Sequence, residues 1–221
     1  MLVINRLLWL LWLNSILLVI ILILLTDTSK GSADTEYVSS GYIIVKEIKV
    51  VGDEVSESTS PPLSMEQVIK QFILNYKPDL GESIAEEYAE IIVHASSVYE
   101  EDPLWVTAMV AQESGFRSDV VSRSNAIGLM QILPSTAKPY EVGRDDLFDP
   151  QVNITLGVRY LHDLQKQYGL DLKMATIAYN QGITNVKKGN YNVKYYHLVK
   201  GYYDAIVDFA YELSNQEALE F

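Results

Sequence analysis

The feature that most constrains this chain is an apolar run near its start. Residues 7–25 contain only Asn14 and Ser15 as polar residues, and about 20 apolar residues are enough to cross a bilayer as a helix. Arg6 is the only charged residue before the run, and a basic N-terminal flank favours a cytoplasmic N-terminus. We therefore expect a transmembrane helix that leaves the rest of the chain on the extracytoplasmic side.

Two interpretations of this run stay open. An uncleaved signal anchor makes the protein a single-pass component of the cell membrane, held there through residues 7–25. A cleaved signal peptide makes it a secreted protein, and the small residues at 31–33 resemble a cleavage site. Signal peptides normally have an apolar region of roughly 7–15 residues, so the length of the run favours the anchor.

The composition excludes several function classes. The 221 residues include no cysteine, which rules out disulfides, thiolate metal sites and cysteine nucleophiles. The net charge of −12 makes nucleic acid an unsuitable partner, because phosphate contacts need a basic surface. The three histidines are far apart in the sequence, so we expect no metal site and no cofactor.

Composition and periodicity divide the chain into four parts. Residues 1–26 are the expected signal anchor, and residues 27–64 form a stalk and linker with many small and polar residues. Within the stalk, β-branched residues at 42–51 predict one or two short strands or a short extended juxtamembrane segment. A leading helix is expected at 65–82, and the main globular domain at 83–214.

Beyond residue 64, apolar residues recur three and four positions apart, which is typical of amphipathic helices. Asp–Pro pairs at 102–103 and 149–150 mark two helix starts, because Asp caps a helix and Pro suits its first position. No stretch supports a large sheet, so the expected fold class is mainly α. The expected helices cover residues 68–76, 84–99, 103–113, 150–164, 173–180 and 195–213.

Glu113 breaks the apolar pattern of the helix expected at 103–113. It falls on the same face as Val106 and Met109, where burying an ionised carboxylate is costly. It also lies in the last turn, where the helix dipole disfavours negative charge. Both effects predict a raised pKa, which suits a general acid. The spacing alone fits equally well a carboxylate that rims the face or caps a loop amide.

Five short motifs in sequence order surround this residue: QESGF at 112–116, SRSNAIGLMQ at 122–131, PSTA at 134–137, LFDP followed by NI at 147–154, and AYNQG at 178–182. In this order and spacing, the chain resembles the lytic transglycosylase family, whose SLT-type domain is goose-lysozyme-like. The resemblance covers about residues 85–190. It implies a lysozyme-like helical catalytic domain behind the membrane segment.

The resemblance also implies a reaction. Glu113 matches the family's single catalytic acid, which cleaves the β-1,4 bond of peptidoglycan between N-acetylmuramic acid and N-acetylglucosamine. The acid protonates the glycosidic oxygen and then acts as a base toward the muramic C6 hydroxyl, which closes a 1,6-anhydro ring. An internal hydroxyl explains why no second carboxylate is needed, whereas ordinary glycosidases use two. The implied partners are glycan strands of peptidoglycan.

The matching motifs imply substrate-binding residues as well. Ser114 is expected to orient the catalytic carboxyl group or contact the sugar, or else simply to cap the helix. Tyr179 is expected to hold the carboxyl group by its phenol or to flank the sugar, and Asn180 to position an acetamido group. Met130 and Gln131 are expected to line the cleft. The full set of expected substrate-binding residues is Ser114, Ser122, Met130, Gln131, Tyr179, Asn180 and Tyr195.

Some positions depart from the family pattern. Asn125 stands where the family usually has glycine, and Asn tolerates a positive φ better than most residues. The family's late tyrosine has three candidates, Tyr191, Tyr195 and Tyr196, of which we choose Tyr195. Gly157 lies inside an expected helix at a cost of roughly 1 kcal/mol relative to Ala, which predicts that another helix packs closely at this point.

Two other functions stay open. A hydrolytic muramidase would use water in place of the C6 hydroxyl, with Asp119, Asp145 or Asp146 as the second carboxylate. A wall-binding component of an envelope-spanning secretion or conjugation apparatus would need no catalysis, and an active enzyme could serve the same apparatus by opening the wall locally. The mass of the reaction products separates the two enzymes, because hydrolysis adds water.

Overall fold

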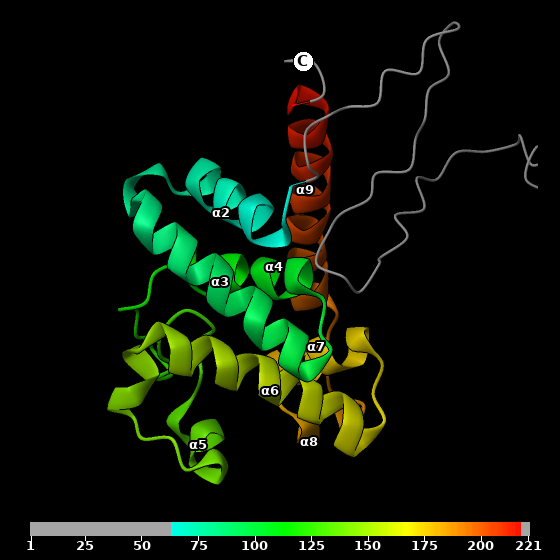
Figure 1. Ribbon diagram of the computed structural model, residues 1–221. Coiled ribbons are helices and arrows are strands. Elements are labelled where there is room, and N and C mark those ends of the chain that lie inside the picture. Colours follow the sequence, from blue (N-terminus) through cyan, green and yellow to red (C-terminus); the bar gives the residue numbers. More distant parts are fainter. Residues whose placement is uncertain (1–62, 218–221) are drawn as a thin grey trace, which may run out of the picture. The chain divides into compact units, whose positions relative to one another are not determined.

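The computed structural model describes residues 63–217. The described part is helical, with no strand and only two isolated β-bridges in one loop, so the expected mainly α fold class is confirmed for it (Figure 1). The α-helices are α2 (Met65–Tyr76), α3 (Glu82–Tyr99), α4 (Pro103–Ser114), α5 (Pro134–Ala137), α6 (Pro150–Tyr168), α7 (Leu172–Gln181), α8 (Ile183–Lys187) and α9 (Lys194–Glu217). The short 3₁₀ turns are η1 (Pro78–Leu80), η2 (Lys138–Tyr140) and η3 (Asp145–Phe148).

Several expectations fall outside the described residues. They are the signal anchor with its apolar run at 7–25, the stalk up to residue 62, and the extended segment at 42–51. Within residues 63–217, none of the helices combines the length and the apolar character that a bilayer span requires. The expected leading helix at 65–82 is divided into α2, which ends at Tyr76, and η1.

The helix starts follow the capping residues of the sequence. The Gln67 backbone N–H donates to Ser64 Oγ at 3.2 Å and the Ser64 N–H donates to Gln67 Oε1 at 2.7 Å, so α2 begins with a capping box. Asp102 accepts a hydrogen bond from the Leu104 N–H at 2.8 Å at the start of α4. Asp149 caps α6 in the same way. Both helix starts predicted from Asp–Pro pairs are confirmed.

Helix α4 is the most buried element of the core. All of its 12 residues are buried except Gln112 and Glu113. It packs against α3 and α9, and Figure 1 shows it behind α3 and beside the long α9. The indole of Trp105 donates to Thr176 Oγ1 at 3.1 Å, which joins α4 to α7. Glu113 therefore lies where the central helix of the fold emerges from the core.

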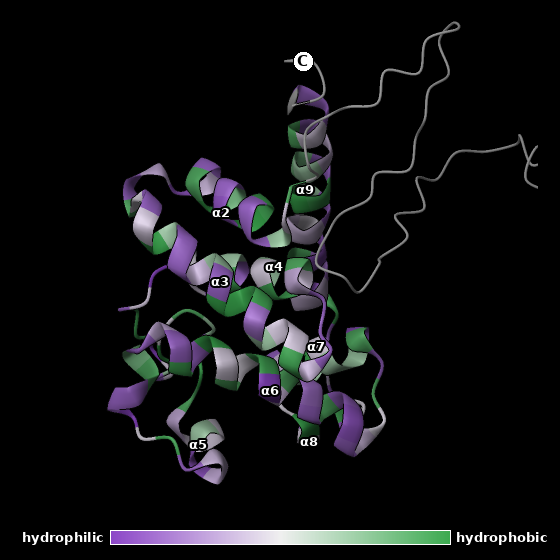
Figure 2. Ribbon diagram, viewed as in Figure 1, coloured by the Kyte–Doolittle hydropathy of each residue, from purple (hydrophilic) through white to green (hydrophobic). Residues whose placement is uncertain are grey.

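The helices around α4 are amphipathic. Helix α2 packs on α3 and α9, α3 packs on α6, and α6 packs on α7. Hydrophobic and hydrophilic residues alternate along α3, α6 and α9 in Figure 2, as expected for helices with one face in a core. Burial of these apolar faces, at roughly 25 cal/mol per Å², stabilises the arrangement that holds the end of α4 in place.

Candidate active site

Glu113 lies in the last turn of α4, where its side chain meets α9. The phenol of Tyr195 donates a hydrogen bond to Glu113 Oε1 at 2.6 Å. Tyr195 is itself buried, with 6% of its surface exposed, so this contact is fixed by the packing of α9 on α4. Among the three tyrosine candidates of the sequence, Tyr195 is the one that reaches the carboxyl group.

The environment of Glu113 raises its pKa from the ordinary value of 4.5 to about 7. Burial is the cause, because the charged form loses its hydration, and the hydrogen bond from Tyr195 acts in the opposite direction and only partly offsets it. The upward shift that the sequence predicted is confirmed. A carboxyl group with this pKa can both give and take a proton near neutral pH.

Tyr179 of α7 lies near the same carboxyl group but bonds elsewhere. Its phenol donates to the backbone carbonyl of Met130 at 2.9 Å. Burial raises the pKa of the Tyr179 and Tyr195 phenols well above 10, and the nearby Glu113 charge adds to both shifts. Both phenols therefore stay protonated as donors. The hydrogen bond to Glu113 comes from Tyr195, and contact of Tyr179 with a sugar stays a prediction.

The loop between α4 and α5 carries Met130 and Gln131. The sequence analysis expected Met130 to line the cleft, but its side chain is fully buried. The reason is its contact with Gly157 of α6, where an added Cβ would lie only 2.3 Å from Met130 Sδ. Close packing at Gly157 is therefore present, but the partner is a loop side chain and not the neighbouring helix that the sequence predicted.

Gln131 is engaged with its own loop. Its backbone φ is 49°, and its amide Nε2 donates to the carbonyls of Val120 and Gly128 at 3.2 and 3.0 Å. These bonds brace the turn, and the predicted hydrogen bond to glycan stays a prediction. Asn125, which replaces the usual glycine, has a φ of 62°, so its expected tolerance of a left-handed backbone is confirmed.

Asn153 of α6 is a residue that the sequence analysis quoted without giving it a role. It is 99% buried, with 1% of its surface exposed. Its Nδ2 donates to the carbonyls of Ile127 and Leu147 at 2.9 and 2.7 Å, and its Oδ1 accepts the Met130 N–H at 2.7 Å. All three bonds of this amide hold loop backbone beside the candidate site.

The remaining predicted residues have the following contacts. Ser114 Oγ donates to the Val110 carbonyl and accepts the Arg117 N–H, both at 3.3 Å, which caps the end of α4. Ser122 Oγ accepts the Ala126 N–H at 3.0 Å within the loop. Asn180 is exposed in the last turn of α7. Binding of substrate by these serines and by the asparagine stays a prediction.

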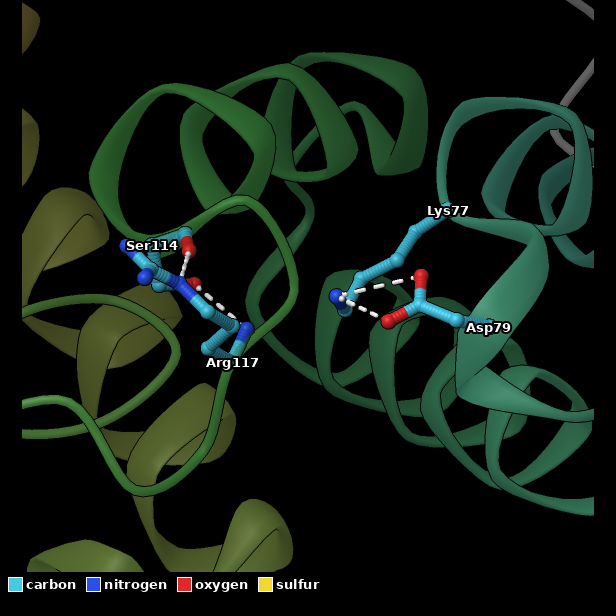
Figure 3. Close-up of polar contacts among 4 residues, drawn as sticks. All are labelled: Lys77, Asp79, Ser114 and Arg117. Atoms are coloured by element: carbon cyan, nitrogen blue, oxygen red, sulfur yellow. Dashed lines mark hydrogen bonds and ion pairs between the residues drawn. The ribbon is translucent and has the colours of Figure 1, made fainter.

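An open pocket of about 570 Å³ adjoins Glu113. Of the predicted site residues, Glu113 and Ser114 line it, and the others do not. Figure 3 shows parts of its two sides, with Ser114 and Arg117 at the end of α4 and the Lys77–Asp79 ion pair at the end of α2. The lining residues are Tyr76, Lys77, Asp79, Ala111, Gln112, Glu113, Ser114, Gly115, Arg117 and Tyr202.

The sequence analysis missed the lining residues from α2, η1 and α9. Only long-range packing brings Tyr76, Asp79 and Tyr202 to the end of α4, and no local pattern signals it. Throughout residues 63–217, no three or more histidine, cysteine, aspartate or glutamate side chains gather in a way that could hold a metal ion. The pocket offers the buried carboxyl group of Glu113 with its phenol donor Tyr195, and the exposed carboxyl group of Asp79 lies on another part of its wall.

Comparison with known proteins agrees with this geometry. Residues 90–197 match the family model described as "Transglycosylase SLT domain". The chain is 35% identical over 135 residues to the membrane-bound lytic murein transglycosylase C of Photorhabdus laumondii, an alignment that covers 54% of this chain and 38% of the relative. It is 33% identical over 135 residues to the protein of the same name from Edwardsiella ictaluri, with the same two coverages.

Among the solved structures to which the chain is similar is the 70 kDa soluble lytic transglycosylase of Escherichia coli. It has a TM-score of 0.47 and 22% sequence identity, and the match covers 69% of this chain and 30% of that one. The fold and site define a helical domain with a buried carboxylic acid of raised pKa beside a pocket. Residues 90–197 of this chain belong to the transglycosylase SLT domain family. The chain spans 38% of the length of the two curated relatives.

Proposed function

We propose that this chain is a peptidoglycan lytic transglycosylase that cleaves the β-1,4 bond between N-acetylmuramic acid and N-acetylglucosamine. The observation that carries the proposal is Glu113, an acid with a pKa of about 7 held by Tyr195 beside an open pocket. Its position within an SLT domain, in a chain whose relatives are named lytic murein transglycosylases, supports the same activity.

In the proposed reaction, one carboxyl group makes both proton transfers. Protonated Glu113 gives its proton to the glycosidic oxygen as the bond from that oxygen to the muramic C1 breaks. The Glu113 carboxylate then takes the proton of the muramic C6 hydroxyl as this oxygen bonds to C1. The ring closes to the 1,6-anhydro sugar, Glu113 is protonated again, and no water is consumed. A tethered hydroxyl also has the rate advantage of an intramolecular nucleophile.

A hydrolytic muramidase is the second candidate, and one observation favours it. None of the expected second carboxylates, Asp119, Asp145 and Asp146, lines the pocket, but Asp79 does. Its ion pair with Lys77 at 3.1 Å lowers the pKa of the Asp79 carboxyl, which keeps it ionised as a base for water would need to be. Its side chain is 77% exposed, so it lacks the burial that distinguishes Glu113.

We further propose that the enzyme is anchored in the cell membrane through residues 7–25, with its catalytic domain on the extracytoplasmic side. The apolar run supports this placement, and two relatives are named as membrane-bound enzymes. Tethering would limit wall cleavage to the neighbourhood of the anchor. A local role of this kind suits an envelope-spanning secretion or conjugation apparatus.

Mass spectrometry of the products tests the proposal. The full chain in detergent is incubated with purified peptidoglycan, and the released fragments are expected to carry 1,6-anhydro ends, lighter by one water than hydrolytic products. Glu113→Gln should release none. Hydrolytic products that disappear in Asp79→Asn would establish the muramidase instead, and full activity of Glu113→Gln would contradict both candidates.

A further inference from the structure

Arg117 lies in the loop after α4, and its side chain folds back over the end of that helix. Its Nε donates to the Ser114 carbonyl at 2.9 Å, and its backbone N–H donates to Ser114 Oγ (Figure 3). Arg117 lines the pocket together with Glu113. The guanidinium group is therefore held by one hydrogen bond to the Ser114 carbonyl, and the Arg117 backbone by a second bond to the same residue, next to the proposed catalytic acid.

The charge of Arg117 is not neutralised by the described part of the protein. None of the ion pairs formed within residues 63–217 includes it, whereas Lys77 in the same pocket is paired with Asp79 at 3.1 Å. The chain around it is acidic overall, with a net charge of −12. A guanidinium has five N–H donors, and the bond to Ser114 uses one of them.

The charge also acts inside the pocket. Arg117 lowers the pKa of the Tyr76 phenol, although the neighbouring Tyr202 and burial raise it to about 12 overall. The two phenolic oxygens lie 3.3 Å apart and join α2 to α9 at the pocket wall. The guanidinium, the phenols and Glu113 thus share one space that is open to a ligand.

A purely structural role is the simpler alternative. A cation at the C-terminal end of a helix stabilises it through the helix dipole, and the bond from Arg117 Nε to the Ser114 carbonyl fits that role. This explanation uses one donor and gives no reason for the charge to face a pocket with the catalytic acid. The two roles differ in what they do to ligand binding, so an experiment can separate them.

Part of the pocket lies outside the SLT domain match. Tyr76, Lys77 and Asp79 precede residue 90, and Tyr202 follows residue 197. The pocket therefore joins the domain's own Arg117 to a wall that α2, η1 and α9 add to it. A subsite built in this way belongs to this chain as a whole and extends beyond the residues that carry the reaction.

We propose that this pocket is an anion subsite in which Arg117 binds a carboxylate of the substrate while Glu113 acts on the neighbouring glycosidic bond. The choice of a glycan as the ligand rests on the proposed function. Peptidoglycan offers two sources of carboxylate: the lactyl group of a muramic residue without a peptide, and the peptide attached to that group. Guanidinium groups bind carboxylates through paired N–H donors, and Arg117 has such donors unused.

Calorimetric binding to the full-length Glu113→Gln chain in detergent tests this, because the ligand is not consumed. Three tetrasaccharides serve as probes: alternating glycan with peptides, the same glycan after an amidase has freed its lactyl carboxylates, and an N-acetylglucosamine tetramer without any carboxylate. We expect at least one carboxylate probe to bind about tenfold more tightly than the neutral tetramer, the gain for one charge-assisted hydrogen bond.

Adding Arg117→Gln should abolish that preference, and Arg117→Lys should retain part of it. Arg144→Gln is the matched control, since Arg144 is paired with Asp145 outside the pocket, and it should leave the preference intact. Thermal unfolding of the Arg117 variants measures separately how much Arg117 stabilises the C-terminal end of α4. The probe whose preference depends on Arg117 identifies the source of the carboxylate.

Equal binding of all three probes, no binding of any, or a preference that survives Arg117→Gln would each overturn the anion subsite. The fate of the proposed reaction is decided independently by the products that the unmodified chain releases. A chain that releases no products but binds carboxylate probes through Arg117 would keep the subsite and lose the reaction. A chain that releases anhydro products without this preference would keep the proposed reaction and lose the anion subsite.

Discussion

The two ends of α4 carry acidic residues in opposite circumstances. At the start of the helix, Asp102 and the preceding Glu101 are surrounded by donors. At the end, Glu113 has one neutral donor and an open pocket. Burial raises the pKa of all three carboxyl groups, so burial alone does not distinguish them.

The hydrogen-bond partners of Glu101 and Asp102 distinguish these two carboxyl groups from that of Glu113. Gln165 Nε2 donates to both oxygens of Glu101 at 2.7 and 2.9 Å, and His162 Nδ1 lies 3.6 Å from it. Asp102 accepts hydrogen bonds from the first turn of α4. These groups lower the pKa of each carboxyl and oppose the effect of burial. The bonds to Glu101 connect its carboxyl group to α6, and those to Asp102 cap the start of α4.

The comparison teaches that a buried carboxylate is structural where its oxygens are satisfied and reactive where they are not. Glu113 keeps one oxygen free of any bond within the described residues, and its pKa stands at about 7. The same helix therefore has hydrogen-bonded, structural carboxyl groups at its start and a carboxyl group that can give a proton at its end.

The same substitution at the two ends should have opposite consequences. Glu113→Gln removes the proton that the reaction needs and should lower kcat by at least about a hundredfold, since general acid–base groups contribute roughly 10²–10⁴-fold. Glu101→Gln should leave kcat per folded molecule within about twofold. Initial rates of fragment release from peptidoglycan measure both. Comparable losses at the two positions would contradict the division of roles.

The raised pKa of Glu113 should make the free energy of unfolding depend on pH. The pKa of Glu113 in the folded state, about 7, lies above its ordinary 4.5, so the folded state binds this proton more tightly than the unfolded state. The contribution of this proton to the free energy of unfolding is then fully present below pH 4.5 and is lost as the pH rises through 7. The free energy of unfolding of Glu113→Gln, measured relative to that of the unmodified chain, should therefore rise by up to about 3 kcal/mol between pH 4 and pH 8.

Urea unfolding of the two chains at both pH values measures this gain. Every other titrating group is common to the two chains, so its contribution cancels in the difference. A gain that does not change with pH would mean that Glu113 has an ordinary pKa.

Substitution of Glu101, at the start of α4, should lower the free energy of unfolding. In Glu101→Gln an amide N–H₂ faces the Gln165 donor, and the loss of a satisfied buried acceptor should cost about 1–3 kcal/mol. Glu100→Gln is the matched control, because the Glu100 side chain is 81% exposed and 3.9 Å from Lys166, where an ion pair contributes little. Urea unfolding compares them, and equal values would show that the partners of Glu101 do not matter.

Removing the single donor at the reactive end should give the smallest effect. Tyr195→Phe loses the hydrogen bond that lowers the pKa of Glu113, so the alkaline limb of the pH–rate profile should move upward from about pH 7. Loss of one hydrogen bond to a charged group should also reduce kcat by about tenfold.

Tyr196→Phe, one residue further along α9, is the control for this change. Tyr196 packs against Trp105 and makes no hydrogen bond to Glu113, so its profile should keep its limb near pH 7. A limb that stays in place in Tyr195→Phe would show that another group sets the pKa of Glu113.

Local chemistry in the sequence was enough for the helices and for the acid. Asp–Pro caps and apolar spacing located α4 and α6, and the misplaced charge at Glu113 indicated its raised pKa. What failed depended on contacts between distant residues. Met130 turned inward because α6 has no side chain at Gly157, and neither residue signals the other within a local window.

The pocket shows the same limit. Its wall combines Tyr76 with Tyr202, which are 126 residues apart, and Arg117 joins them through the turn after α4. Each is an ordinary residue in its own segment, so no spacing rule singles it out. The phenol at Glu113 was an intermediate case. The family resemblance selected Tyr195 as the late tyrosine but offered Tyr179 as the phenol that holds the carboxyl group, and the packing of α9 gives that contact to Tyr195.

The side chain of Asn153 has a consequence for how this protein tolerates change. Its one amide group supplies two donors and an acceptor to the loop at 127–130 and to η3, and no other amino acid of that size offers the same set. Aspartate would turn the two donors into repelling oxygens. Leucine would leave the buried Met130 N–H without its acceptor, whereas the Ile127 carbonyl would keep the Ile132 N–H as a donor. Random variation should therefore spare position 153, because this one side chain fixes the loop between α4 and α5 against α6.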